Sequence, residues 1–159
     1  MHNNQHDGSK LNYALMKYLS SNIGEEIQSI AARRFLPSVN VYVYRECLNS
    51  FRPKSEQKFK LILNGWWMHH PKCFPPSEYI DPLLVSMHFD RTIRSVIAGN
   101  RSSVNYLREH GPVGCRDKDT MSFLLEHDIP AYYSGCMTLT LTENRHIKAS
   151  EGGGVCIVC

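Results

Sequence analysis

The sequence has no apolar run long enough to cross a bilayer, and its first ten residues, MHNNQHDGSK, lack the apolar centre of a signal peptide. We therefore expect a cytoplasmic protein. The basic residues are not gathered into a stripe either: they are scattered from Lys10 to Lys148 with acids among them, and the net charge is +3. This distribution argues against nucleic acid as a partner, because surfaces that follow phosphates concentrate Lys and Arg on one face.

The sequence also lacks the spacings of common cofactor and metal sites. It has neither the glycine fingerprint of a dinucleotide site nor a phosphate-binding loop. His69, His70 and Cys73 match no standard zinc pattern, and Cys156 and Cys159 would point to opposite faces of a strand. We expect no metal and no resident cofactor. No Ser/His/Asp order and no pair of catalytic carboxylates is evident, which disfavours a simple hydrolase.

The composition is that of a folded domain. Apolar residues make up 42% of the chain and charged residues 21%, and the six cysteines mostly occur singly in apolar segments, as reduced thiols do. A chain of 159 residues has room for one core. We expect a polar leader over residues 1–10, one Rossmann-like domain over residues 11–150, and at residues 151–159 a glycine-rich linker where a second domain would begin.

Seven segments predict strands, and helical segments separate most of them. The strand candidates cover residues 13–19, 39–46, 58–65, 82–89, 112–115, 131–136 and 155–159, and the third is expected to stop at Asn64-Gly65. This alternation favours parallel pairing with right-handed crossovers. We therefore expect an α/β fold, with a Rossmann-like, mostly parallel sheet and helices on both faces. Ligands in such folds bind beyond the carboxyl ends of the strands.

Cap residues predict where the helices begin. The first helix follows Ser21 and Asn22, Ser102 caps a later short helix, and Asp117 caps another. A weak helical turn is expected over residues 92–98. The apolar stripe of the first helix is expected to comprise Ile27, Ile30, Ala31 and Phe35.

The turn Asn22-Ile23-Gly24-Glu25, after the first strand, is the first candidate site. A helix N-terminus presents free N–H groups and a partial positive charge, and Gly24 lets a ligand approach the backbone closely. Ordinary capping, with acids that complement the helix dipole, explains the same residues. The sequence leaves both interpretations open.

Arg116 and Asp117 form the second candidate, after the fifth strand. A guanidinium at the end of a strand stands at the mouth of the cleft, where it can hold a carboxylate or phosphate through two hydrogen bonds. The alternative is a local contact between the two residues together with capping of the next helix.

The third candidate is the segment Asn64-Gly65-Trp66-Trp67, which continues to His69. Indole faces form flat apolar platforms for sugar rings, and a histidine can act as an acid, a base or a donor near neutral pH. The alternative is that the tryptophans cover the core.

Three stretches, NIGEEIQSIAARRFLP, LILNGWWMH and VGCRDKDTMSFLLEHDIPAYYSGCMTLTL, together resemble the amino-terminal half of polysaccharide pyruvyl transferase family proteins. Members typically show Asn-x-Gly-Asp after the first strand, a glycine-rich turn after a middle strand, and Arg-Asp or Arg-Glu with Ser or Thr three residues beyond that acid. The matching positions here are Asn22-Ile23-Gly24-Glu25, Asn64-Gly65-Trp66, and Arg116-Asp117 with Thr120. Glu25 stands where the family usually has Asp, and the middle turn has become Asn-Gly-Trp-Trp.

The resemblance implies one half of a fold like that of GT-B glycosyltransferases, and a role in exopolysaccharide biosynthesis. The implied reaction transfers a pyruvyl group from phosphoenolpyruvate to a saccharide as a ketal. Arg116 would hold the donor, and Glu25 or His69 would assist deprotonation of the acceptor. The implied binding residues are Asn22, Gly24, Asn64, Gly65, Trp66, Trp67 and Asp117.

A second domain or a partner chain is expected to supply the rest of the donor site, so the chain is expected to be incomplete alone. Two alternatives stay open. One is half of a GT-B-type glycosyltransferase that uses a nucleotide sugar, and the other is a non-catalytic carbohydrate-binding remnant.

Overall fold

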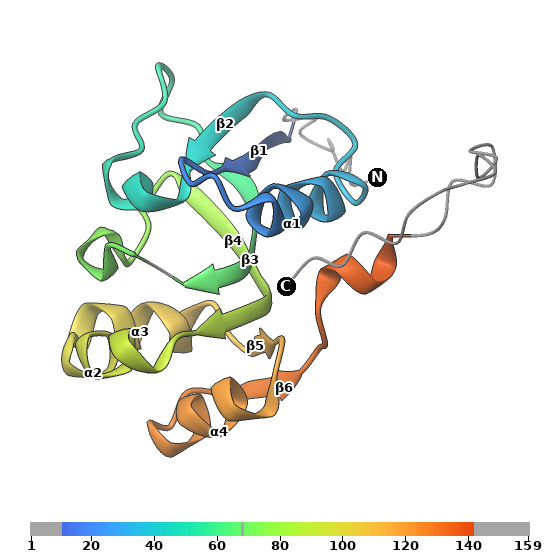
Figure 1. Ribbon diagram of the computed structural model, residues 1–159. Helices are drawn as coiled ribbons and strands as arrows, with labels where there is room; N and C mark the ends of the chain where they lie inside the picture. The colour runs from blue at the N-terminus through green and yellow to red at the C-terminus, as the bar shows by residue number, and fades with distance from the viewer. Residues whose placement is uncertain (1–10, 68, 142–159) are drawn as a thin grey trace, which may run out of the picture.

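One parallel sheet of six strands organises the computed structural model, which describes residues 11–67 and 69–141. The strands lie in the order β2-β1-β3-β4-β5-β6, and each neighbouring pair is parallel (Figure 1). The expected α/β, Rossmann-like fold is confirmed. The strands are β1 (Asn12–Lys17), β2 (Val41–Tyr44), β3 (Phe59–Trp67), β4 (Ile80–Phe89), β5 (Val113–Cys115) and β6 (Ala131–Tyr133).

Helices connect the strands, and their caps are mostly those that the sequence predicts. Asn22 accepts a hydrogen bond from the N–H of Gly24 at 2.9 Å, and Asp117 accepts one from the N–H of Thr120 at 2.7 Å. The α-helices are α1 (Ile23–Arg33), α2 (Arg91–Gly99), α3 (Arg101–Glu109) and α4 (Lys118–Glu126). The described residues also form three 3₁₀ helices: η1 (Arg45–Ser50) between β2 and β3, η2 (Pro71–Cys73) between β3 and β4, and η3 (Met137–Thr140) after β6.

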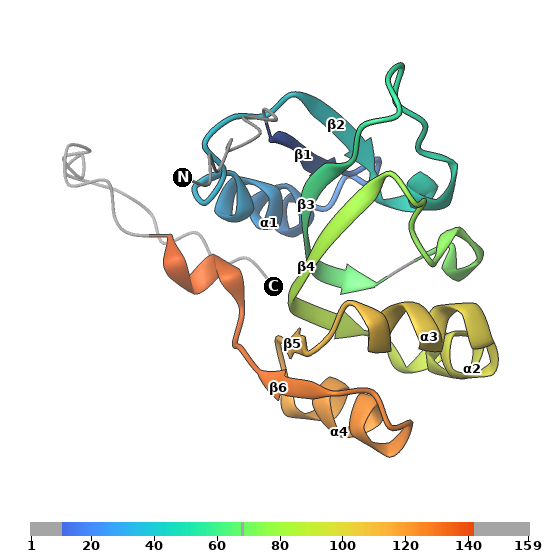
Figure 2. The ribbon, with the colours of Figure 1, turned by 180° about the vertical axis from the view of Figure 1, so that it is seen from behind.

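The helices cover both faces of the sheet. Along β1, Leu15 packs with Ala32 and Leu36 on the side of α1, whereas its neighbours Ala14 and Met16 belong to the larger core on the opposite side. That larger core includes side chains of α2, α3 and α4. Figures 1 and 2 show these three helices grouped near β4, β5 and β6, while α1 lies beside β1.

Strand β3 extends further than the sequence predicts. It was expected to stop at Asn64-Gly65, but it continues to Trp67, which pairs with Phe89 of β4. A register shift between Leu63 and Gly65, where Gly65 has a φ of 91°, absorbs the irregularity without ending the strand. The predicted stop was wrong because a glycine at positive φ serves a bulge as well as a turn.

The buried face of α1 also differs from the predicted apolar stripe. Ile30 and Phe35 are exposed, and the residues that face the sheet include the polar Glu25, Gln28 and Ser29. These polar groups find partners inside, so burial of this face does not require apolar side chains. Helix α3 differs in its cap, because Asn100 rather than Ser102 accepts its first free N–H groups.

Leader residues 1–10, the segment 151–159 and the pair Cys156 and Cys159 lie outside the described residues. Within the described part of the chain, no helix is both long and apolar enough to span a membrane.

Candidate functional site

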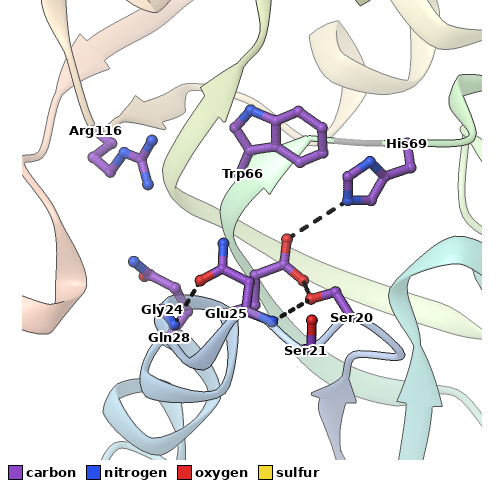
Figure 3. Close-up of a pocket in the computed structure, with 9 residues that line it drawn as sticks. Ser20, Ser21, Gly24, Glu25, Gln28, Trp66, His69 and Arg116 are labelled. Carbon is purple, nitrogen blue, oxygen red and sulfur yellow. Dashed lines mark hydrogen bonds and ion pairs between the residues drawn. The ribbon is translucent and has the colours of Figure 1, made fainter. Parts of the chain in front are cut away.

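A cavity of about 550 Å³ lies at the carboxyl end of the sheet, where the strand order reverses. From β1 the chain proceeds to β2 on one side, whereas β3 and the later strands extend to the other side. Ligands in open α/β sheets bind at such a switch point. Three separate segments line the cavity (Figure 3): Ser20, Ser21, Asn22, Gly24, Glu25 and Gln28 from the first turn and α1, Trp66 and His69 from the end of β3, and Arg116 after β5.

The turn between β1 and α1 forms the floor of this cavity. Asn22 caps α1, and a Cβ at Gly24 would lie 3.0 Å from Asn22 Oδ1, so this position favours glycine. The Ser20 hydroxyl donates to Glu25, one turn into the helix. Capping and cavity formation therefore use the same residues, and the two interpretations of the turn are not exclusive.

Glu25 is held by a buried arginine that sequence reasoning missed. Arg45 is 1% exposed, and its Nη1 lies 3.1 Å from Glu25 Oε1. Its Nε pairs with Glu46 at 2.7 Å, its Nη1 donates to the Trp66 carbonyl at 2.9 Å, and its guanidinium lies 4.7 Å from the centre of the Tyr18 ring. A buried charge needs such partners, so Arg45 fixes both the carboxylate and the strand that carries Trp66.

His69 follows β3 and contacts two cavity residues. Its Nε2 is 3.9 Å from Glu25 Oε1, and its ring centre is 4.5 Å from that of Trp66. The imidazole is half exposed, so it can exchange protons with solvent or with a bound hydroxyl. Glu25 and His69 thus form a carboxylate–imidazole pair at one side of the cavity.

Arg116 lies at the other side, with Trp66 between it and His69 (Figure 3). Its backbone N–H donates to the Met87 carbonyl at 2.8 Å, which fixes the end of β5 against β4. No described residue forms a hydrogen bond or an ion pair with its guanidinium. The cavity therefore has the Arg116 guanidinium on one side and the Glu25–His69 pair on the other, with the Trp66 indole between them. This arrangement is suited to a small anion with hydroxyl groups.

Four predicted binding residues lie outside the cavity lining. Trp67 is fully buried and packs edge-on against Phe74, so it covers the core, the alternative that the sequence left open. Asn64 is also fully buried, and its Nδ2 donates to the Gln28 carbonyl at 3.0 Å. Gly65 brings the strand against α1, because a Cβ there would lie 3.3 Å from Gln28 Cγ.

Asp117 is the fourth, and it forms a second polar cluster beside the cavity. Its Oδ2 lies 2.6 Å from Nδ1 of His88, the residue that pairs with Trp66 across β3 and β4. Burial acts to raise the pKa of Asp117, but hydrogen bonds from Thr120 and His88 outweigh it and hold the pKa below its usual value. The predicted local contact with Arg116 is not formed.

The residues that the sequence analysis missed carried weak signals. Arg45 follows a strand directly, as Arg116 does, and the same reasoning applied to β2 would have found it. Gln28 lies one turn beyond Gly24, on the same face of α1. His88 gave no signal of its own, because it lies inside an apolar segment.

Among the described residues, no three His, Cys, Asp or Glu side chains lie close enough to hold a metal ion. Comparison of the chain with protein families, with curated proteins and with solved structures found no match.

Proposed function

We propose that this chain is a polysaccharide pyruvyl transferase-like protein, which transfers a pyruvyl group from phosphoenolpyruvate to a saccharide as a ketal. The observation that carries the proposal is the guanidinium of Arg116, which has no hydrogen-bond or ion-pair partner among the described residues and lies across the Trp66 indole from the Glu25 and His69 pair. Each of the three motifs that resemble this family contributes at least one residue to the cavity lining, and this agreement is additional support.

The reaction needs charge stabilisation and proton transfer. Two hydroxyl oxygens of the acceptor form bonds to C2 of the enolpyruvyl group, C3 gains a proton, and the bond from C2 to the phosphate oxygen breaks. Phosphate leaves with the second hydroxyl proton. Arg116 binds the donor's carboxylate or phosphate, which a guanidinium recognises through paired hydrogen bonds.

His69 transfers the proton in this proposal, and Glu25 orients its imidazole. His69 has an exposed ring, whereas Glu25 is buried and engaged by Arg45 and Ser20. Trp66 offers its indole to the sugar ring, a common platform for saccharides. The remaining donor contacts come from a second domain or a partner chain.

Calorimetric titration with phosphoenolpyruvate tests the donor site. We expect saturable binding, weakened about 10- to 100-fold in Arg116→Gln, because a hydrogen bond to a charged group contributes about 1.5–3 kcal/mol. Arg52→Gln removes an arginine from the exposed loop before β3 and should leave the affinity unchanged.

A second assay tests transfer by measuring the phosphate released from phosphoenolpyruvate when a mixture of bacterial-type oligosaccharides is offered as acceptor. We expect His69→Gln to lose turnover but to retain donor binding. Tighter binding of a nucleotide sugar than of phosphoenolpyruvate would replace this proposal with the glycosyltransferase alternative. Sugar binding that is insensitive to Arg116→Gln, without phosphate release, would favour a carbohydrate-binding protein.

A further inference from the structure

The two sides of the cavity carry opposite charges. Glu25 and Glu46 both pair with Arg45, at 3.1 Å and 2.7 Å, so two carboxylates share one guanidinium on this side. Among the described residues, the one further basic group within ion-pair distance of either carboxylate is His69. His69 must be neutral to accept a proton from the acceptor, and the side of Glu25 then has one net negative charge. Arg116 gives the other side a positive charge.

Glu25 presents its carboxylate to the cavity, although most of the side chain is buried. Figure 3 shows this carboxylate directed toward His69 and Trp66. Its Oε2 accepts a hydrogen bond from the Ser20 hydroxyl, and its Oε1 faces Arg45 and His69. A carboxylate has about four acceptor positions, so a donor from a ligand can still bind. The 3.9 Å between Glu25 and His69 exceeds a hydrogen bond, so one ligand group can contact both.

The N-terminus of α1 does not add a site for an anion, although helix N-termini commonly bind anions. The N–H groups of Gly24 and Glu25 donate to the side chain and the carbonyl of Asn22, at 2.9 Å and 3.0 Å. Glu25 and Glu26 place acidic groups in the first turn of the helix. An anionic donor is therefore favoured on the side of Arg116, and a cationic or neutral group on the side of Glu25.

We propose that the acceptor is an unacylated amino sugar, whose ammonium group lies beside Glu25 while its ring packs on Trp66. An ammonium group donates three hydrogen bonds and offsets the net negative charge of this side. Ser20 and Ser21 line the same side, where their hydroxyls can bond those of the sugar. Two further sugar hydroxyls supply the ketal oxygens. The role as acceptor rests on the proposed function, whereas the preference for an ammonium group rests on the charges alone.

Titrations with three methyl glycosides test this preference on the full chain, followed by the amide chemical shifts of Gly24 and Glu25. The glycosides of glucosamine, N-acetylglucosamine and glucose differ at C2, and only the first carries a charge at about pH 7. We expect glucosamine to bind at least roughly four-fold more tightly, the effect of one attractive charge about 5 Å away in a water-like medium. Added salt should weaken the preference. Equal affinities, or tighter binding of N-acetylglucosamine, would overturn the proposal.

Glu46→Gln shows whether the net charge is the cause. Glu46 does not line the cavity, so this variant removes a negative charge without changing a lining residue, and it should remove most of the preference for glucosamine. Glu56→Gln is the matched control in the exposed loop before β3, and it should retain the preference. An undiminished preference in folded Glu46→Gln would contradict the proposal. The salt series on the unmodified chain does not depend on whether a variant folds.

Phosphoenolpyruvate separates this inference from the proposed function. If glucosamine is preferred but phosphoenolpyruvate neither binds nor releases phosphate, the amino-sugar site stands and pyruvyl transfer fails. If phosphate is released with the glucose or N-acetylglucosamine glycoside at least as fast as with the glucosamine glycoside, the transfer stands and the choice of an amino sugar fails.

Discussion

The two faces of the sheet are built on different principles. The face covered by α1 has a small apolar cluster of Leu15, Ala32, Leu36 and Ile62, and beside it lie buried polar groups of Glu25, Gln28 and Asn64. The face covered by α2, α3 and α4 has a larger apolar core, and the buried polar side chains of these helices are the hydroxyls of Ser103 and Thr120. The difference separates the face with most of the apolar burial from the face that borders the cavity, where each buried polar group costs free energy unless it finds a partner.

The polar face should be the more sensitive to loss of one partner. Arg45→Ala leaves the Glu25 carboxylate buried without its cation, and we expect a loss of about 3–5 kcal/mol in the free energy of unfolding. Urea unfolding measures this loss. Arg45→Met combined with Glu25→Gln removes both charges and should recover part of it. A loss below about 1 kcal/mol for Arg45→Ala would mean that the ion pair does not organise this face.

Substitutions in the core of the apolar face should change the free energy of unfolding but not the affinity for ligand. Leu124→Ala creates a cavity in the core and should cost about 3 kcal/mol. The affinity of the folded protein for phosphoenolpyruvate should stay unchanged. Its neighbour Leu125 is largely exposed, so Leu125→Ala is the matched control, with less than about 0.5 kcal/mol expected. A change in affinity caused by Leu124→Ala would contradict the prediction that only the polar face affects phosphoenolpyruvate binding.

The sequence predicted the apolar face better than the polar one. Strand order cannot be read from one sequence, but the alternation of strands and helices was enough for the sheet and for Arg116, Gly24 and Trp66 at one edge of it. The buried stripe of α1 was predicted only in part: Ala31 is buried, whereas Ile30 and Phe35 are exposed. Apolar periodicity does not register a buried Glu25 that is neutralised by Arg45, twenty residues later. Trp67 was misplaced because the bulge at Gly65, which let β3 continue, has no sequence signal distinct from a turn.

Substitution of Asp117, beside the cavity, should lower the free energy of unfolding by a smaller amount, and that amount should depend on pH. Asp117→Ala removes the cap of α4 and should cost about 1 kcal/mol, whereas Asp117→Asn retains a capping oxygen and should cost less than about 0.5 kcal/mol. Because the folded pKa of Asp117 is lowered, its contribution is complete above the unfolded pKa of about 3.9 and declines as the pH falls through the folded value.

Acid titration of stability compares these two variants. The unmodified chain should lose stability below pH 4 more steeply than Asp117→Asn, in which this group cannot titrate. Identical acid slopes for the two proteins would show that the hydrogen bonds from Thr120 and His88 do not favour the charged carboxyl.

The smallest effect is expected on the outer side of α1. Ile30 is exposed, so Ile30→Ser should change the free energy of unfolding by no more than about 0.5 kcal/mol. Ala32 is buried against the sheet, and Ala32→Leu should cost about 1–3 kcal/mol by overpacking. A larger loss of unfolding free energy for Ile30→Ser than for Ala32→Leu would indicate that Ile30 is buried, as the sequence predicts.

Amide chemical shifts during a phosphoenolpyruvate titration test most directly the claim that the polar face is a ligand site. The account predicts saturable shifts at Gly24, Glu25 and Arg116, and none at Leu107 and Leu124 in the apolar core of the opposite face. Absence of shifts at the cavity with millimolar ligand, or shifts concentrated in α2, α3 and α4, would contradict it.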